Sequence, residues 1–298
     1  MQTPWGECAI ADAHVHFFSL PFFESLAVQA GKTADSIADS LGWELPAADP
    51  GELARRWASD LDSKGIARAA IIASIPADEA SVTAAAAACP GRFLPYAMFN
   101  PLAPNPPAWE GLRGICLFPA MHRYSIHDAR VEPLLEQAAA RGVIVFVHGG
   151  VLTVGVRKRL GLPSLFDMRF SNPIDLHPVA LRYPQVSFVV PHFGAGYFRE
   201  ALMLVDLCPN VYLDTSSSNS WTRYEGLELK MVFRRALEVA GPSRLLFGSD
   251  SSFFPRGWNS GIFEQQTRVL VELGIGNADA RLILGGNLER LAGAAWAV

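Results

Sequence analysis

The sequence predicts an α/β fold of the (β/α)8 (TIM) barrel class, forming a single domain over residues 1–298. Eight short runs of apolar, β-branched or aromatic residues recur along the chain, and helical patterns separate them. Most of these runs are apolar throughout, which is typical of strands buried on both faces of a parallel sheet. Eight such strands alternating with helices fit a closed barrel. An open doubly wound sheet is the alternative, but no Gly-x-Gly-x-x-Gly turn follows an early strand.

The predicted strands are short and evenly distributed. They cover residues 9–13, 67–74, 93–99, 114–118, 143–147, 187–191, 211–214 and 244–247. Helix start signals lie between them, because an acidic or amide residue followed by proline often opens a helix. The predicted helices are 51–63 after Asp49-Pro50, 78–89 from Asp78 to Cys89, 132–141 from Glu132-Pro133, and one from Asn172-Pro173 that ends before Pro184.

One unit of the predicted barrel is irregular, and four of its connections are long. Residues 100–107 read NPLAPNPP, which is too rich in proline for a normal helix, so we expect that helix to be short or absent. The long connections are 17–48, 149–171, 215–223 and 251–261. Each follows a strand and would project from the C-terminal face, where barrel enzymes build their active sites.

Composition limits the class of protein. Half of the residues are hydrophobic and 18% are charged, with a formal net charge of −4, which argues against disorder and against a basic surface for nucleic acid. Cys8, Cys89, Cys116 and Cys208 are far apart and form no Cys-x-x-Cys pair, as in reduced cytoplasmic proteins. No signal peptide or membrane-length apolar run is visible. We expect a soluble cytoplasmic protein with a small-molecule substrate, without nucleic-acid or membrane partners.

Polar residues gather at the ends of four predicted strands. His14 and His16 end the first strand and share a face, because side chains alternate along a strand. His148 ends the fifth strand, His192 the sixth and Asp250 the eighth. Imidazole and carboxylate groups at one rim are ligands for a zinc-like cation with an open position for water. A lone His-x-His is a weak signal, and His148 alone could be a core histidine, so the coincidence of these strand ends predicts the metal site.

These residues make the sequence resemble the amidohydrolase superfamily. Within it, the resemblance is to the amidohydrolase-related branch that contains aminocarboxymuconate semialdehyde decarboxylase and related aromatic-acid decarboxylases. It rests on Asp12-Ala13-His14-Val15-His16, Val147-His148-Gly149, Pro191-His192-Phe193-Gly194, Phe247-Gly248-Ser249-Asp250 and the stretch 283–291. These elements span nearly the whole chain.

The resemblance implies a role for each of these polar residues. His14, His16 and His148 would ligate the metal. Asp250 would be a further ligand that exchanges a proton with bound water, and His192 would contact that water as general acid or base. A divalent cation lowers the pKa of its water from 15.7 toward about 7, which suits this chemistry. A fifth ligand or a structural histidine remains the alternative for His192.

The chain departs from the superfamily pattern in two places. Binuclear members carry a carboxylated lysine or a glutamate at the end of strand 4, whereas residues 114–119 read GICLFP. One divalent ion, zinc, is therefore expected, and Cys116 is expected to be buried and inert. The related decarboxylases follow the strand-8 aspartate closely with proline, but Pro255 comes after Ser251, Ser252, Phe253 and Phe254. The resemblance therefore does not indicate which residues after Asp250 contact the substrate.

Arginines and aromatic residues in the long connections are candidate substrate contacts. Arg157, Arg169 and Arg256 could bind a substrate carboxylate, and Trp221 could line an apolar pocket. Surface solubility and packing of the loops explain such residues equally well. The remaining histidines are weaker candidates. We expect His177 to be structural, and we expect His122 and His127 to lie solvated in a polar loop after the fourth strand, with a substrate contact as the alternative.

Three functions remain open from the sequence. The leading hypothesis is a mononuclear zinc-dependent hydrolase that attacks a small acidic or aromatic amide, ester or lactone through metal-bound hydroxide. The alternative is a non-oxidative decarboxylase of an aromatic or muconate-type acid that uses the same site. The third is a non-catalytic barrel that acts as a binding protein. A homodimer is a possible assembly.

Overall fold

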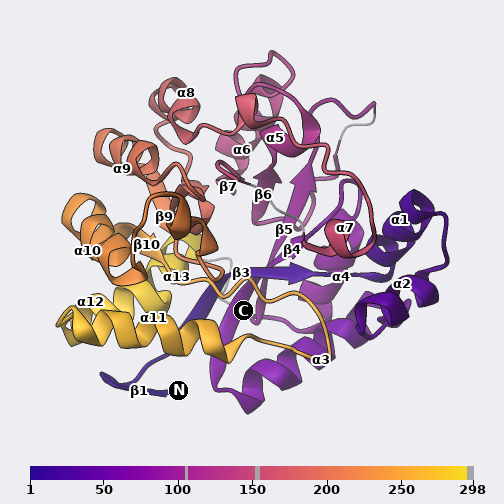
Figure 1. Ribbon diagram of the computed structural model, residues 1–298, viewed down its shortest axis with the longest axis horizontal. Helices are drawn as coiled ribbons and strands as arrows, with labels where there is room; N and C mark the ends of the chain where they lie inside the picture. Colours follow the sequence, from indigo (N-terminus) through magenta and orange to yellow (C-terminus); the bar gives the residue numbers. More distant parts are fainter. Residues whose placement is uncertain (105–106, 152–154, 294–298) are drawn as a thin grey trace.

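A closed parallel barrel forms the centre of the computed structural model, which describes residues 1–104, 107–151 and 155–293 (Figure 1). A short antiparallel hairpin, β1 (Gln2–Thr3) and β2 (Gly6–Glu7), precedes it. Eight parallel strands then follow one another in the sheet in chain order. They are β3 (Ile10–Phe17), β4 (Ile66–Ala73), β5 (Phe93–Phe99), β6 (Gly114–Leu117), β7 (Ile144–Val147), β8 (Phe188–Val190), β9 (Val211–Asp214) and β10 (Leu245–Leu246).

Backbone hydrogen bonds between β3 and the chain after β10 close the barrel. Ala13 N donates to Phe247 O at 2.8 Å, Asp250 N donates to His14 O at 2.9 Å, and His16 N donates to Ser251 O at 2.7 Å. The first and last strands therefore meet, and the predicted (β/α)8 barrel is confirmed. We call this closing contact the β3–β10 seam.

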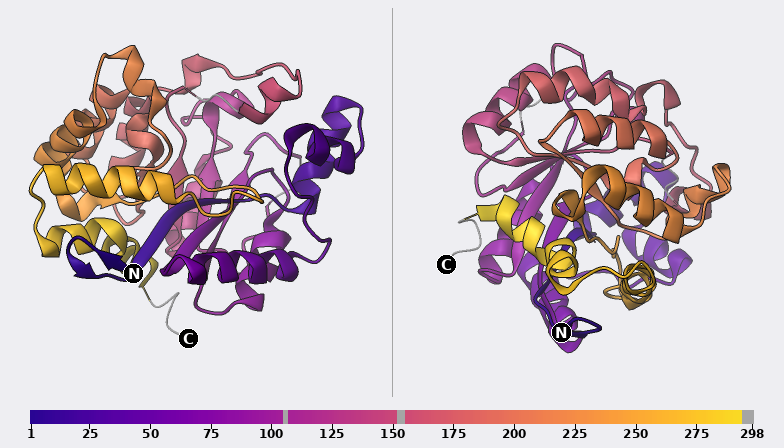
Figure 2. Two further views of the ribbon diagram at one scale, coloured as in Figure 1. Left: turned by 60° about the horizontal axis from the view of Figure 1, so that its bottom comes forward. Right: turned by 90° about the vertical axis from the view of Figure 1, so that its left-hand side faces the viewer.

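Helices surround the sheet on its outer face, as the two views of Figure 2 show. They are α1 (Leu20–Ala30), α2 (Ala34–Leu41), α3 (Pro50–Ser63), α4 (Glu79–Ala88), α5 (Pro119–His122), α6 (Glu132–Arg141), α7 (Gly155–Arg159), α8 (His177–Arg182), α9 (Phe198–Leu207), α10 (Leu229–Ala240), α11 (Ser260–Glu272), α12 (Asn277–Arg281) and α13 (Asn287–Ala292). The predicted cap at Asp49 is confirmed, since its Oδ1 accepts from Gly51 N at 2.9 Å. α6 ends at Gly142, whose φ of 63° favours glycine.

Several predicted boundaries differ from the structure. The first strand extends to Phe17, beyond the predicted 9–13, while the last strand shrinks to Leu245–Leu246. Asp78 precedes α4 without capping it, because its carboxylate accepts hydrogen bonds from Ser19 and Ser81 instead. The helix predicted from Asn172 is divided into a 3-10 turn, Pro173–Leu176, and α8. No helix is present in residues 100–104 and 107–113, as the prolines predict; Asn105 and Pro106 lie outside the described residues.

Alternation along the strands divides the core into two layers. Ile144 and Phe146 of β7 pack inside the barrel, whereas Val145 and Val147 pack against the helices. In β3 the pairing register shifts between Asp12 and Val15. Bulges of this kind re-aim side chains next to active sites. Here Ala13 and His14 lie within the shift, and His16 follows it.

The connection after β3 folds into a helical pair beside the barrel mouth. α1 and α2 bury Phe22, Phe23, Leu26 and Ile37 in a cluster that includes Val156 of α7. All three helices lie at the right of Figure 1. Phe22 of α1 and Gly155 and Val156 of α7 line the space above the strand ends. No helix in the described residues is long and apolar enough to span a membrane.

Candidate active site

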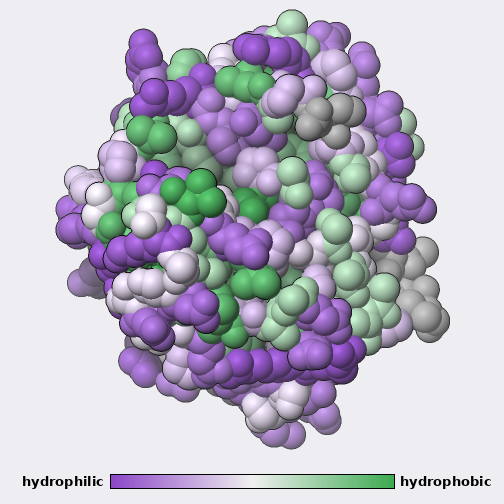
Figure 3. Space-filling model, turned by 90° about the vertical axis from the view of Figure 1, so that its right-hand side faces the viewer, coloured by the Kyte–Doolittle hydropathy of each residue, from purple (hydrophilic) through white to green (hydrophobic). Residues whose placement is uncertain are grey.

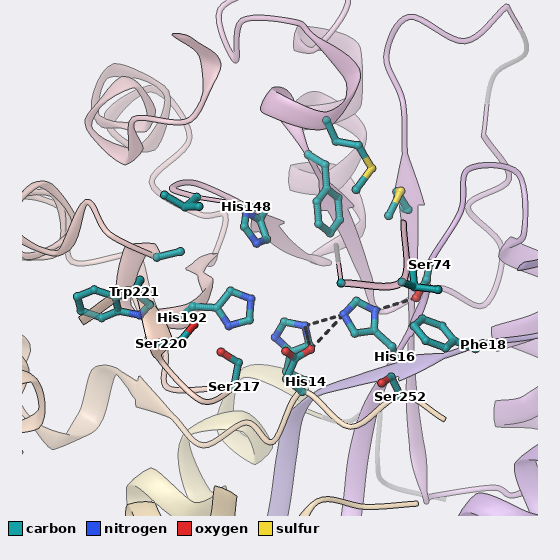
Figure 4. Close-up of a pocket in the computed structure, with 18 of the residues that line it drawn as sticks. His14, His16, Phe18, Ser74, His148, His192, Ser217, Ser220, Trp221 and Ser252 are labelled. Atoms are coloured by element: carbon teal, nitrogen blue, oxygen red, sulfur yellow. Dashed lines mark hydrogen bonds and ion pairs between the residues drawn. The ribbon is translucent and has the colours of Figure 1, made fainter. Parts of the chain in front are cut away.

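Three side chains bring their ligand atoms together above the β3–β10 seam. His16 Nε2 lies 3.3 Å from His14 Nε2 and 3.3 Å from Asp250 Oδ1, and His14 Nε2 lies 3.7 Å from the same oxygen. All three ligand atoms are within 4.8 Å of one another, which makes them a candidate metal site. Figure 4 shows the imidazoles of His14 and His16 next to each other in the pocket, joined by a dashed line. We call His14, His16 and Asp250 the ligand triad.

Neighbouring oxygen atoms orient both imidazoles of the triad. His14 Nδ1 lies 2.7 Å from Asp214 Oδ2, and His16 Nδ1 lies 2.7 Å from Ser74 Oγ. A ring whose Nδ1 is held in this way turns its Nε2 toward a metal. Two imidazoles and a carboxylate are also donors that zinc accepts, so the residues present fit such an ion.

His148 and His192 line the same cavity but lie outside the ligand triad. Their ring centroids are 5.3 Å apart, and His192 is 5.1 Å from His14 (Figure 4). His148 stacks on Phe118, and its Nδ1 is buried without a hydrogen-bond partner in the described part of the chain. Its role as a ligand and that of His192 as acid or base therefore stay predictions.

The local backbone at two of these residues is unusual. His192 and Asp250 have φ angles of 54° and 58°, in the left-handed region that residues with a Cβ seldom adopt. Such conformations persist where the surroundings enforce them, and they cluster at functional sites. For Asp250 the enforcing contact is its own N–H, which donates to His14 O across the β3–β10 seam.

Burial and neighbouring charges set the protonation of the site. Burial and the adjacent His192 and His14 hold the pKa of His148 well below its ordinary value, and burial also lowers the pKa of His192. Burial opposes the charged form of His14, but the carboxylate of Asp214 raises its pKa overall. Desolvation alone would raise the pKa of Asp250, yet the hydrogen bond from His16 and the nearby imidazoles lower it. Neutral imidazoles and an ionised carboxylate are the forms that bind metal.

A buried carboxylate at Asp12 ties the site to its supporting strands. It accepts hydrogen bonds from His14 N at 2.9 Å, Ser249 N at 3.1 Å and Trp258 Nε1 at 2.7 Å. Burial nevertheless raises the pKa of Asp12 to about 6. Asp12 thereby fastens the segment that carries Asp250 to β3.

Sequence reasoning assigned no role to Asp214, Ser74 or Asp12. Asp214 ends β9 at the same rim as the histidines, so its position at a strand end was a usable signal. Ser74 directly follows β4 and was equally placed. Their contacts with His14 and His16 join residues far apart in the chain, and no local pattern reveals such pairs.

The site opens into a cavity of about 430 Å³ with aromatic walls. Figure 3 shows the molecule from the side of α1 and α2, where hydrophobic and hydrophilic residues are mixed on the surface. Among the predicted substrate contacts, Trp221 and Arg256 line the cavity. Arg157 and Arg169 are not among its lining residues. The former donates to Pro163 O and Gln29 Oε1, and the latter pairs with Asp167.

The other candidate residues fall in different surroundings. The prediction that His122 is solvated is wrong: it ends α5, its Nδ1 is buried without a hydrogen-bond partner in the described chain, and burial lowers its pKa to about 4. His127 is exposed, as expected. His177 begins α8. Cys116 is fully buried, and burial raises the pKa of its thiol, in keeping with an inert residue.

Comparison with known proteins places this geometry in a family. The sequence model of the amidohydrolase family matches residues 11–293. The chain belongs to the amidohydrolase family. It is therefore an enzyme of the amidohydrolase superfamily, whose members are metal-dependent. The non-catalytic alternative is set aside by this membership.

Similar proteins include one sequence relative and several solved structures. The protein FluG of Emericella nidulans is 38% identical over 85 residues, which cover 28% of this amidohydrolase and only 10% of FluG. The 5-carboxyvanillate decarboxylase LigW of Sphingomonas paucimobilis is 14% identical with a TM-score of 0.62, covering 96% of this chain and 99% of that one.

Two further structures extend the comparison. A putative 2-pyrone-4,6-dicarboxylic acid hydrolase of Pseudomonas putida is 17% identical, with a TM-score of 0.58 and coverage of 96% and 97%. An amidohydrolase of Burkholderia multivorans with bound zinc is 16% identical, with a TM-score of 0.62 and coverage of 97% and 99%. At these identities the solved structures share the fold with this chain, and they include both hydrolases and decarboxylases.

Proposed function

We propose that this amidohydrolase is a mononuclear zinc-dependent hydrolase of a small amide, ester or lactone that carries a carboxylate or an aromatic group. The observation that carries the proposal is the ligand triad at the edge of a cavity of about 430 Å³, a volume in the usual range for small-molecule sites. His148 lines the same cavity and is the fourth ligand in this proposal.

The residues of the cavity divide the chemical work. A bound zinc ion would supply Lewis-acid catalysis and make a water molecule more acidic. The Asp250 carboxylate accepts the proton of the attacking water, and His192 handles the proton of the leaving group. Hydrolysis needs a proton taken from water and a proton given to the leaving group, so two separate proton-handling groups suit it.

Arg256 is the proposed anchor for a substrate carboxylate. Its guanidinium lies 4.4 Å from the ring centroid of Phe253 and donates to Ser252 Oγ at 3.0 Å. It forms no salt bridge with any carboxylate of the described residues, so its charge is available to a ligand. Trp221 on another part of the wall provides apolar contact.

Non-oxidative decarboxylation is the second candidate. The cavity walls contain Phe18, Phe22, Trp43 and Phe118, which would pack against a flat aromatic or unsaturated acid. An acid held by Arg256 could lose carbon dioxide in the same site. The two reactions differ in products and not in the residues required.

One experiment separates these proposals. Metal content is measured on protein purified without chelator, for wild type and the His14→Ala/His16→Ala variant, with His127→Ala as an exposed control. We expect about one zinc ion per chain in wild type and His127→Ala, and none in the double variant. The metal-loaded protein is then offered lactones, esters, amides and aromatic acids. Carbon dioxide release without hydrolysis would establish the second candidate, and no metal in wild type after zinc addition would overturn both.

A further inference from the structure

Ser216 lies between the imidazoles of His14 and His192. Its Oγ is 2.9 Å from His14 Nδ1 and 2.8 Å from His192 Nδ1, and the residue is fully buried. The two rings are tilted by 31° toward each other, with centroids 5.1 Å apart, and Figure 4 shows them side by side. One hydroxyl group therefore contacts both a member of the ligand triad and the proposed acid or base.

The position of Ser216 is fixed by its surroundings. Its N–H donates to Asp214 Oδ1 at 2.6 Å. Gly248 packs against it so closely that a Cβ on Gly248 would lie 2.7 Å from Ser216 Cβ. The Ser216 hydroxyl is thus held in one position between the rings of His14 and His192.

Hydrogen-bond chemistry assigns the proton on each ring. Asp214 Oδ2 is 2.7 Å from His14 Nδ1, and an ionised carboxylate only accepts, so His14 Nδ1 carries hydrogen. At His192 Nδ1 the two partners are Ser216 Oγ at 2.8 Å and Ser216 O at 3.2 Å. A carbonyl oxygen also only accepts. Both contacts are satisfied when His192 Nδ1 carries hydrogen and donates to Ser216.

We propose that Ser216 is a positioning residue that holds neutral His192 with hydrogen on Nδ1, so that the lone pair of Nε2 faces the cavity. In this arrangement the proton that Asp250 takes from the attacking water passes to Nε2 of His192, which becomes imidazolium and gives that same proton to the leaving group, while its Nδ1–H bond to Ser216 is unchanged. The catalytic part of this inference rests on the proposed function, and the hydrogen-bond assignment rests on the contacts of Ser216 alone.

The unusual backbone of His192 supports this role. Its φ of 54° and ψ of 34° place it in the left-handed region, and its carbonyl oxygen accepts from Ala195 N at 2.9 Å to close the turn. The ring is thereby directed to Ser216 from a turn that ordinary strand geometry would not produce. The left-handed conformation of His192 and the hydroxyl of Ser216 together orient the His192 ring.

Nitrogen NMR of the metal-free protein tests the assignment directly. In ¹⁵N-histidine-labelled wild type at a pH where His192 is neutral, we expect its Nδ1 to show the protonated shift and its Nε2 the unprotonated shift. His14 should show the same pattern at a pH above its own, raised pKa. Hydrogen on Nε2 of His192 would overturn the proposal, and this measurement needs neither a variant nor a substrate.

Substitution of Ser216 provides the second test. Ser216→Ala should give His192 averaged ¹⁵N shifts and lower kcat about 10-fold or more with KM little changed, since contacts of this kind are usually worth 10- to 100-fold. Thr215→Val is the matched control: it is an adjacent, fully buried hydroxyl whose partner is Gln266 Oε1 and not a histidine. It should leave the shifts and kcat unchanged.

The outcomes distinguish this inference from the proposed function. Wild-type shifts for His192 in a folded Ser216→Ala variant would sink the positioning role, even if the enzyme hydrolyses a lactone. Nδ1-protonated His192 in a wild type that binds no zinc would sink the proposed function and leave the hydrogen-bond assignment intact. Thermal unfolding of each variant identifies any loss that comes from misfolding.

Discussion

The orientation of an imidazole that binds metal through Nε2 depends on the group that its Nδ1 contacts. His14 Nε2 can face a cation only while Nδ1 carries the hydrogen, and Asp214 enforces that state from 2.7 Å away. Ser74 has the corresponding contact with His16. The ligands and their supporting residues therefore act as pairs, and each pair can be broken separately.

Asp214→Asn tests the pair at His14. An amide can turn its NH2 group toward His14 Nδ1, which would move the ring hydrogen to Nε2 and oppose metal binding. We expect the Kd for zinc to rise about 10- to 100-fold, as for other supporting residues of metal sites. Competition with a chromophoric chelator measures it. Asp206→Asn on the exposed face of α9 is the control, and an equal Kd in both variants would contradict the pairing.

His122 makes stability depend on pH. Its pKa is lowered from 6.5 to about 4 by burial, so between these values the unfolded chain binds more protons than the folded chain. The free energy of unfolding therefore falls as pH decreases from 6.5 toward 4, by at most about 1.4 kcal/mol per pH unit from this residue. Urea unfolding at pH 7 and pH 5 should show a smaller loss for His122→Phe than for wild type. Equal losses would show that His122 is solvated.

Residues at strand ends were predictable, and their partners were not. His14, His16 and Asp250 stand beside recognisable strands, and position alone brings them to one rim. Ser216 and Ser74 look like ordinary loop serines in the sequence. Their importance arises from distances of 2.7–2.9 Å to rings that belong to other strands.

At the scale of elements, the segment after β10 acts as a strap that presents Asp250. Trp258 Nε1 donates to Asp12 Oδ2 at 2.7 Å, and Trp258 N donates to Asp60 Oδ2 at 2.8 Å. Asn259 N donates to Ser251 Oγ at 2.8 Å. Among the described residues, the segment pairs with β3 only through Asp250 and Ser251, so these contacts hold the remainder of it in place.

Trp258→Phe should loosen this strap. It removes the donor to Oδ2 of the fully buried Asp12 carboxylate, whose Oδ1 keeps its bonds from His14 N and Ser249 N, and a buried acceptor left without a partner costs about 1–3 kcal/mol. Denaturant unfolding at pH 7 should show that loss of stability, with weaker zinc binding. Trp5→Phe is the matched control, because it removes a hydrogen bond to the neutral Ile275 O at a partly exposed site. If the free energy of unfolding fell equally in the two variants, the hydrogen bond to the Asp12 carboxylate would be no stronger than one to a neutral backbone oxygen.

The helices predicted from Asp49-Pro50 and Glu132-Pro133 closely match α3 and α6, whereas α1 and α2 were missed inside the long segment 17–48. Their caps were present in the sequence: Ser19 accepts from Phe22 N, Thr33 accepts from Ser36 N, and Gly31 and Gly42 end the helices in left-handed conformations. The two helices are stable because Phe22 and Ile37 pack together with α7. That packing depends on a segment far along the chain, which no local pattern specifies.

For the whole molecule, zinc would join the beginning of the barrel to its end. His14 and His16 belong to β3, and Asp250 follows β10 on the other side of the seam. A ligand that binds only the folded state stabilises it by about 2.7 kcal/mol at 100 times its Kd. Zinc should therefore raise the unfolding temperature and chelator should lower it.

The control for this prediction is the His14→Ala/His16→Ala variant. Its unfolding temperature should respond to neither zinc nor chelator. A wild type that melts at one temperature under all these conditions would contradict a metal that bridges the seam. A response confined to wild type would support it.

The β3–β10 seam also orders events during biosynthesis. A ribosome delivers both histidines of the ligand triad with the first barrel strand, and Asp250 only after all eight strands have been made. Until then the growing chain carries the two imidazoles without the carboxylate that is proposed to complete their site. The proposed ligand set is complete only when the segment after β10 has been made and has paired with β3, so metal loading would follow closure of the barrel.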